Sequence, residues 1–170
     1  MRHELARRDG GFTLIETMAV VAILCILAAF AAPGMSRLLA TQKIRSASYD
    51  LNSDLTYARG EAIARGHQVT VKSASGGTDW VSGWEIWDVT ASPNVKLRQQ
   101  DALAQDITFS ADAQSVTYER TGRATATPAT ATGTVSFTIA PRDTSAAAES
   151  KRCMRLDPSG RPTTAVGACS

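Results

Sequence analysis

The sequence predicts an α+β fold, in which one long N-terminal helix packs against an antiparallel β-sheet. Three observations support this prediction. An almost uninterrupted apolar run fills residues 12–32, apolar residues then recur at helical spacing over residues 33–66, and short segments with a two-residue period occupy residues 67–170. With 170 residues, the chain is long enough for one domain with its own core.

The apolar run has the length and composition of a membrane-spanning helix. It carries one charged residue, Glu16, in 21 positions, and a helix of that length reaches about 30 Å, the thickness of a bilayer core. The preceding residues 1–11 hold three arginines against two carboxylates. Because net positive flanks stay on the cytoplasmic side, we expect the remainder of the chain to lie across the membrane.

The second helical stretch is amphipathic. Its apolar positions are predicted to face the core and its charged positions to face solvent. Pro33 and Gly34 follow the apolar run, where a kink is tolerated, and Gly66 is a suitable helix end. The predicted core positions are Leu38, Ile44, Ala47, Leu51, Leu55, Ala58 and Ala62, and the predicted solvent positions are Arg37, Lys43, Arg45, Asp50, Asp54, Arg59 and Glu61.

From residue 68 onward, alternating apolar residues predict short strands separated by polar loops. Trp84 and Ile86 are predicted to share one side of a strand, with Glu85 and Trp87 on the other. The tryptophans at 80, 84 and 87 are either core residues or part of a contact surface. Strands are predicted around 69–71, 84–88, 95–98, 107–109, 116–118 and 135–139, with polar loops at 73–77 and 123–134.

Composition and motifs indicate a protein that is not an enzyme. The chain has two histidines and three cysteines, without zinc-site spacing or a glycine-rich phosphate loop after a strand. We expect no catalytic residue, metal or cofactor, and we expect His67 to be an ordinary surface histidine. A net charge of +2 also argues against a surface devoted to binding polyanions.

The junction between the charged and the apolar segments reads Gly11-Phe12-Thr13-Leu14-Ile15-Glu16. It resembles the prepilin cleavage motif of type IV pilins and type II secretion pseudopilins. The resemblance implies that a prepilin peptidase in the membrane cuts between Gly11 and Phe12 and methylates the new amine on Phe12. Residues 1–11 are then a leader peptide.

Glu16 is the unusual residue of the apolar run. A carboxylate at the centre of a bilayer costs about 2.5 kcal/mol or more and usually has a partner, whereas one near the headgroups costs little. Position alone leaves both environments open. The pilin resemblance implies that Glu16 pairs with the terminal amine of a neighbouring subunit during filament assembly.

Two further segments, residues 51–71 and 79–89, resemble the GspH/FimT family of pilin-like proteins. This resemblance implies a single-pass protein of the bacterial inner membrane with its β-rich domain in the periplasm and other pilin subunits as partners. The first hypothesis is a type IV pilus minor pilin acting in assembly at or near the tip. Alternatives are the H-type pseudopilin of type II secretion and an ordinary membrane-anchored protein that is not processed.

The C-terminal region holds Cys153 and Cys169, which enclose 15 residues. After export to an oxidising periplasm, the pair is expected to form a disulfide, and the alternative is two free thiols. Cys25 lies in the apolar run and is expected to act as a small apolar residue.

The same region has an excess of cations. In FimT-type minor pilins, a Gly-Arg-x-Arg motif near the disulfide is associated with DNA uptake. The matching residues are Gly160-Arg161-Pro162-Thr163, with Thr163 in place of the second arginine. The resemblance implies salt-sensitive contact with double-stranded DNA, and the alternative is a solvated basic surface. The candidate DNA-binding residues are Arg161, Arg152, Arg155 and Lys151, and Arg120 and Arg123 are further cations expected to extend the same surface.

Overall fold

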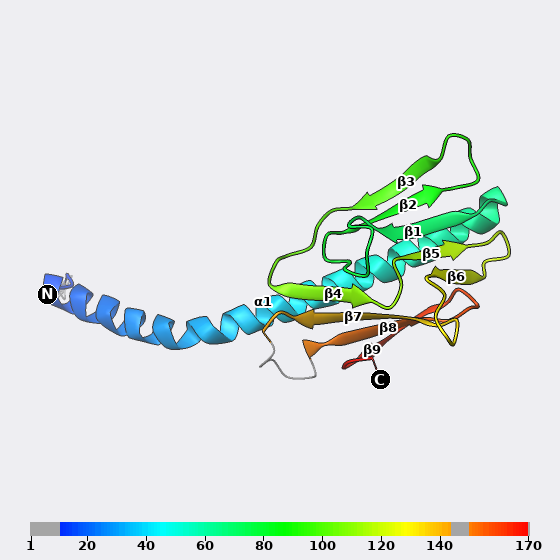
Figure 1. Cartoon of the computed structure of the whole chain (residues 1–170). Coiled ribbons are helices and arrows are strands. Elements are labelled where there is room, and N and C mark those ends of the chain that lie inside the picture. Colours follow the sequence, from blue (N-terminus) through cyan, green and yellow to red (C-terminus); the bar gives the residue numbers. More distant parts are fainter. Residues whose placement is uncertain (1–10, 144–149, 170) are drawn as a thin grey trace, which may run out of the picture. The chain divides into compact units, whose positions relative to one another are not determined.

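The computed structural model describes residues 11–143 and 150–169, and the side chains of residues 29–34, 36 and 37 lie outside that description. The chain divides into two compact units, Met1–Arg37 and Leu38–Ser170. Helix α1 (Leu14–Arg65) is followed, within the described residues, by nine strands (Figure 1). These are β1 (Val69–Ser73), β2 (Trp84–Asp88), β3 (Val95–Gln100), β4 (Ile107–Ala111), β5 (Ser115–Tyr118), β6 (Ala124–Thr127), β7 (Val135–Pro141), β8 (Arg152–Leu156) and β9 (Pro162–Val166).

Helix α1 begins two residues after Phe12. The backbone stays helical through Pro33 and Gly34, so the tolerated kink does not interrupt the secondary structure. The helix ends at Arg65, and Gly66 follows with a φ of 67°. Glycine adopts this left-handed conformation readily and commonly ends helices for that reason.

The strands form two antiparallel sheets. The five-stranded sheet has the order β3-β2-β1-β5-β6, and the four-stranded sheet has the order β4-β7-β8-β9. In Figure 1 the later part of helix α1 lies along strands of both sheets. A helix packed on antiparallel sheet is the predicted α+β arrangement, with two sheets where one was expected.

Strand β6 corrects the prediction that residues 123–134 are entirely loop. Ala124 to Thr127 pair with β5 from Tyr118 back to Ser115. Alternating alanine and threonine have the low complexity of a surface loop, but threonine favours strands and a tight turn before Ala124 returns the chain beside β5. Strands β8 and β9 also fall outside the predicted strands.

The core forms where the amphipathic half of α1 meets the two sheets. Six of the predicted core positions on the helix are buried, but Leu38 is 54% exposed, contrary to prediction. Trp80 and Trp84 are fully buried and pack with Phe109 and Phe137, so these two tryptophans are core residues. The six buried helix residues are Ile44, Ala47, Leu51, Leu55, Ala58 and Ala62.

Asp54 was predicted to face solvent and is instead buried. It accepts a 2.9 Å hydrogen bond from Trp84 Nε1 and pairs with the guanidinium of Arg98, which lies over the ring of Tyr57. A buried carboxylate needs such partners to offset the loss of water. Asp54 therefore connects helix α1 to strand β2 and to the edge strand β3.

One corner of the domain is built from two tight turns that contact each other. The β5–β6 turn closes with a bond from Gly122 N to Glu119 O, and the β8–β9 turn closes with one from Gly160 N to Asp157 O. Arg59 of helix α1 donates to the carbonyl of Gly122 at 3.0 Å. Gly160 has a φ of 79° and lies directly against this carbonyl.

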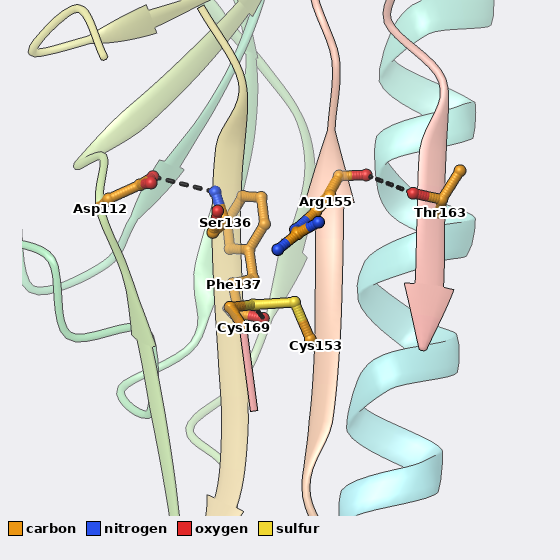
Figure 2. Close-up of a disulfide and its surroundings, with 7 residues drawn as sticks. All are labelled: Asp112, Ser136, Phe137, Cys153, Arg155, Thr163 and Cys169. Atoms are coloured by element: carbon orange, nitrogen blue, oxygen red, sulfur yellow. Dashed lines mark hydrogen bonds between the residues drawn. A yellow bond between two sulfur atoms is a disulfide. The ribbon is translucent and has the colours of Figure 1, made fainter. Parts of the chain in front are cut away.

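The disulfide between Cys153 and Cys169 joins strand β8 to the end of the described chain, which confirms the predicted pair. The two Cα atoms lie 5.0 Å apart. Figure 2 shows Cys153 and Arg155 projecting from the same side of β8, with Cys169 beside Phe137 of β7. Cys25, the remaining cysteine, is exposed and free.

Gly160→Ala is expected to destabilise the domain strongly. A Cβ at this position would lie 2.2 Å from the carbonyl oxygen of Gly122, and backbone atoms cannot yield as a flexible side chain can. We expect a loss of about 3 kcal/mol or more in the free energy of unfolding. Gly66→Ala is the control, because Gly66 is also left-handed but has open space around it, so about 1–2 kcal/mol is expected. Urea unfolding followed by tryptophan fluorescence measures both, and equal losses would contradict the close contact.

Removal of the disulfide by Cys153→Ala with Cys169→Ala is expected to cost about 3 kcal/mol, because the bond closes a loop with a sequence separation of 16. Urea unfolding of the oxidised chain, the reduced chain and the double variant provides the measurement. Cys25→Ala is the control and should unfold like the unmodified chain. Identical stability with and without a reductant would show that the bond does not constrain the domain.

Candidate functional site

The predicted cleavage bond lies in exposed, non-helical backbone. Gly11, Phe12 and Thr13 precede the helix, and all three are exposed. A Cβ added to Gly11 would meet no atom within 4 Å. The Thr13 hydroxyl accepts a 3.3 Å hydrogen bond from the backbone N–H of Glu16, so Thr13 caps the helix immediately after the candidate bond. Within the described chain, the bond between Gly11 and Phe12 is accessible from outside.

Glu16 is the third residue of helix α1. Threonine at the cap and glutamate three residues later is the pattern of a capping box, and the positive end of the helix dipole favours a carboxylate in the first turn. The Glu16 side chain is exposed. Its carboxylate can therefore be reached by a group from another molecule.

The helix segment after Glu16 presents apolar side chains on all sides. A helix that is apolar all round requires cover from other helices or from lipid. Residues 29–32 of the predicted membrane segment have side chains outside the described part. In the portion of the chain that the structure describes, no helix combines the length and apolar character needed to cross a membrane. The large apolar residues at least half exposed over residues 12–28 are Phe12, Leu14, Ile15, Met18, Val20, Val21, Ile23, Leu24, Ile26 and Leu27.

The four candidate DNA-binding residues do not form one patch. Lys151 directly precedes strand β8 and is half-buried. Neighbouring residues on a strand point to opposite faces, so Arg152 shares the face of buried Met154, whereas Arg155 shares the face of Cys153. Arg152 lines a cavity with residues of helix α1, and Arg155 lines a different cavity with Asp112.

Arg161 lies at the corner where the two tight turns meet. Exposed Arg120 and Arg123 come from the β5–β6 turn of the same corner, and Arg59 lies half-buried beneath it. Two carboxylates, Glu119 and Asp157, begin these turns. Hydrogen bonds from Ser159 and from the Arg161 backbone hold the pKa of Asp157 below its ordinary value, so this carboxylate remains ionised near neutral pH.

His67 has a structural contact that the sequence did not indicate. Its Nδ1 lies 3.0 Å from Oδ2 of buried Asp88, at the end of helix α1. Asp88 also accepts hydrogen bonds from the backbone N–H groups of Thr90 and Ala91. The hydrogen bond with His67 holds the pKa of Asp88 below its ordinary value, although burial acts in the opposite direction. The pair joins the end of the helix to the end of strand β2.

No cluster of three or more metal-ligating side chains occurs among the residues that the structure describes.

The outer face of the five-stranded sheet carries Trp87 together with Lys72 and Lys96. The Nζ atom of each lysine lies within 5.2 Å of the centre of the Trp87 ring. Both lysines also pair with Glu85. Trp87 is thus half-buried within a network of charges, unlike the two core tryptophans.

The sequence matches the family model described as "Type II transport protein GspH" over residues 47–164. It also matches the prokaryotic N-terminal methylation motif over residues 6–32. No curated protein matches the chain at a significant level.

Solved structures of two kinds resemble the chain. The type IV minor pilin FimU of Pseudomonas aeruginosa is 25% identical with a TM-score of 0.58, covering 73% of this chain and 89% of FimU. The minor pseudopilin EpsH from the type II secretion system of Vibrio cholerae is 12% identical with a TM-score of 0.58, covering 76% of this chain and 98% of EpsH. At that identity, the EpsH similarity shows the fold alone.

These findings agree with the observed architecture. The GspH match spans most of the globular unit, and the methylation motif includes the candidate cleavage bond, the helix cap and Glu16. Together they imply a membrane-anchored pilin with an exposed globular domain. The chain belongs to the GspH family and is a minor pilin or pseudopilin of a type IV pilus or a type II secretion system.

Proposed function

We propose that the chain is a type IV pilus minor pilin that prepilin peptidase cleaves between Gly11 and Phe12, and that it acts in pilus assembly at or near the tip. The observation that carries this proposal is the arrangement at the start of helix α1. An accessible Gly11–Phe12 bond precedes the Thr13 cap, Glu16 lies exposed in the first turn, and an apolar helix follows. FimU, which the chain resembles, is a type IV minor pilin.

Cleavage would give Phe12 a positively charged amine one helical turn from the Glu16 carboxylate. In a filament core of packed helices, both charges are removed from water, and each is stable only with a partner of opposite sign. The amine of one subunit would therefore pair with Glu16 of its neighbour and fix the axial register. Before assembly, residues 12–32 would lie in the inner membrane, with the β-rich domain in the periplasm.

Substitutions at two positions separate processing from assembly. Gly11→Leu is expected to block cleavage, because a side chain next to the bond obstructs close approach of the peptidase. Glu16→Ala and the neutral, similarly shaped Glu16→Gln are expected to permit cleavage but to remove the chain from sheared filaments. Intact mass and N-terminal sequencing of protein recovered from membranes, with and without the peptidase, measure processing. Immunoblots of the filament fraction measure assembly.

A mature chain beginning at methylated Phe12 would support the proposal. A chain that still begins at Met1 beside an active peptidase would contradict it, and would leave an unprocessed membrane-anchored domain. Normal incorporation of Glu16→Gln into filaments would show that the charge of Glu16 does not direct assembly.

The second candidate is the H-type pseudopilin of type II secretion. It is favoured by the family model, which is described as a type II transport protein. Deletion of the gene distinguishes the two functions. Loss of surface pili with normal protein secretion supports the pilus, whereas loss of secretion with normal pili supports the pseudopilin.

The third candidate is capture of duplex DNA by the exposed domain. The corner that brings Arg161 close to the turn carrying Arg120 and Arg123 favours this candidate, because phosphates attract clustered cations. Arg152 and Arg155 lie on opposite faces of β8 and line different cavities, which argues against the set of four residues that the sequence predicts.

Charge reversal at the corner tests DNA binding. Arg161→Glu with Arg123→Glu is expected to weaken duplex binding by the full-length chain at least about tenfold and to reduce its salt dependence. Fluorescence anisotropy with a labelled duplex at several salt concentrations provides the measurement. Lys43→Glu reverses an exposed cation on helix α1 and is the control. Equal affinity in both variants, or no affinity in the unmodified chain, would exclude this corner as a DNA site.

A further inference from the structure

The start of helix α1 lies very close to the proposed cleavage bond. Gly11, Phe12 and Thr13 are non-helical and exposed, and the Phe12 side chain is 81% exposed. From Leu14 onward the backbone is helical for 52 residues. Only Phe12 and Thr13 separate the helix from the bond between Gly11 and Phe12. Whatever fixes the start of the helix therefore also fixes the backbone conformation at that bond.

Thr13 is the residue at which the helical hydrogen bonds begin. Its carbonyl accepts hydrogen bonds from the N–H groups of Glu16 and Thr17, at 3.1 and 3.2 Å. Its side-chain hydroxyl accepts a further bond from the N–H of Glu16 at 3.3 Å. A carbonyl that enters the helical pattern and a side-chain oxygen that binds an N–H of the first turn define an N-cap residue, whose own backbone is not helical. The hydroxyl thus favours a helix that begins at Leu14 and not earlier.

The neighbouring side chains do not fix this boundary by themselves. Leu14, Ile15 and Glu16 are accepted readily in a helix, and phenylalanine is tolerated there as well. Phe12 has no side-chain oxygen with which to end a helix. Without the Thr13 hydroxyl, the helix can begin one or two residues earlier, and the bond between Gly11 and Phe12 then belongs to its first turn.

The conformation of this bond determines how a peptidase can approach it. The attacking group must reach the Gly11 carbonyl in a defined orientation, and a helical turn presents its backbone curled and surrounded by side chains. A Cβ added to Gly11 would meet no atom within 4 Å, so the described chain leaves space for the enzyme here. A helix that included this bond would have to unwind before cleavage, and the rate would fall accordingly.

We propose that Thr13 is a positioning residue for processing, because its hydroxyl caps helix α1 and keeps the Gly11–Phe12 bond in the non-helical backbone that prepilin peptidase cuts. This inference rests on the proposed cleavage site. It assigns the role to the acceptor oxygen of Thr13 and not to the shape of its side chain. The donor is the backbone N–H of Glu16, so Glu16→Ala and Glu16→Gln keep the cap, in agreement with the cleavage expected of both variants.

Three variants of Thr13 distinguish a helix cap from a shape that the peptidase recognises. Serine and asparagine cap helices at least as well as threonine, whereas valine has nearly the shape of threonine and does not cap. Thr13→Ser and Thr13→Asn should be cleaved at least as fast as the unmodified chain. Thr13→Val should be cleaved about fivefold more slowly, as expected for the loss of a cap. Intact mass over time, with the full-length chain and purified prepilin peptidase in detergent micelles, gives kcat/KM.

Thr17→Val is the matched control for this series. The Thr17 hydroxyl donates to the carbonyl of Leu14 at 2.8 Å, inside the helix, so the same chemical change is made without removing the cap. This variant should be cleaved like the unmodified chain. The proposal is overturned if Thr13→Val is cleaved normally while Thr13→Asn is slow, since the peptidase would then recognise shape. Equal slowing by Thr13→Val and Thr17→Val also overturns it.

The helix boundary can be measured without the peptidase. In the same micelles, ¹³C chemical shifts of Phe12 should be non-helical in the unmodified chain and in Thr13→Asn, and should move toward helical values in Thr13→Val. Slow cleavage of Thr13→Val with unchanged Phe12 shifts overturns the proposal. Equal cleavage of Thr13→Val and the unmodified chain removes the role of Thr13 alone. An unmodified chain that the peptidase does not cleave contradicts the proposed function, and this inference with it.

Discussion

The globular unit depends on burial of one face of helix α1 against two sheets. Six apolar side chains from Ile44 to Ala62 belong to one core cluster with residues of both sheets, including the core aromatic residues. The helix differs along its length: among the described side chains, those of residues 17–28 are almost all apolar and exposed, whereas from Ile44 to Ala62 the apolar side chains are buried on one face. This difference leaves the first segment available for contacts outside the chain while the second holds the domain together.

The helical stripe and the strand alternation could be predicted because each depends on a local repeat. Leu38 continues the repeat but is exposed, because the burial of a helix residue depends on where the sheets end. Asp54 lies three residues after Leu51 and four before Ala58, so its spacing placed it on the core face despite its charge. Its partners Trp84 and Arg98 are distant in sequence, and a local pattern contains no information about them.

The candidate functional residues also divide into those that a local sequence pattern indicates and those that it does not. The N-terminal arrangement is contiguous in sequence, so Gly11, Phe12 and Glu16 can be proposed from the sequence alone. The basic residues near the C-terminus are contiguous as well, but a strand sends adjacent side chains to opposite faces. Arg152 and Arg155 consequently line different cavities, and Arg161 belongs to a turn that contacts the turn carrying Arg120 and Arg123. Contacts of this kind follow from topology, which the sequence pattern does not specify.

The disulfide has a mechanical consequence for the last hairpin. An antiparallel pair under load normally opens from an end, one hydrogen bond after another. Strands β8 and β9 are joined at one end by the turn that contains Gly160 and near the other by the bond from Cys153 to Cys169. A pulling force cannot open the pair sequentially from either end, and must instead rupture several bonds together. Strand β9 is therefore held to β8 near both ends and resists peeling.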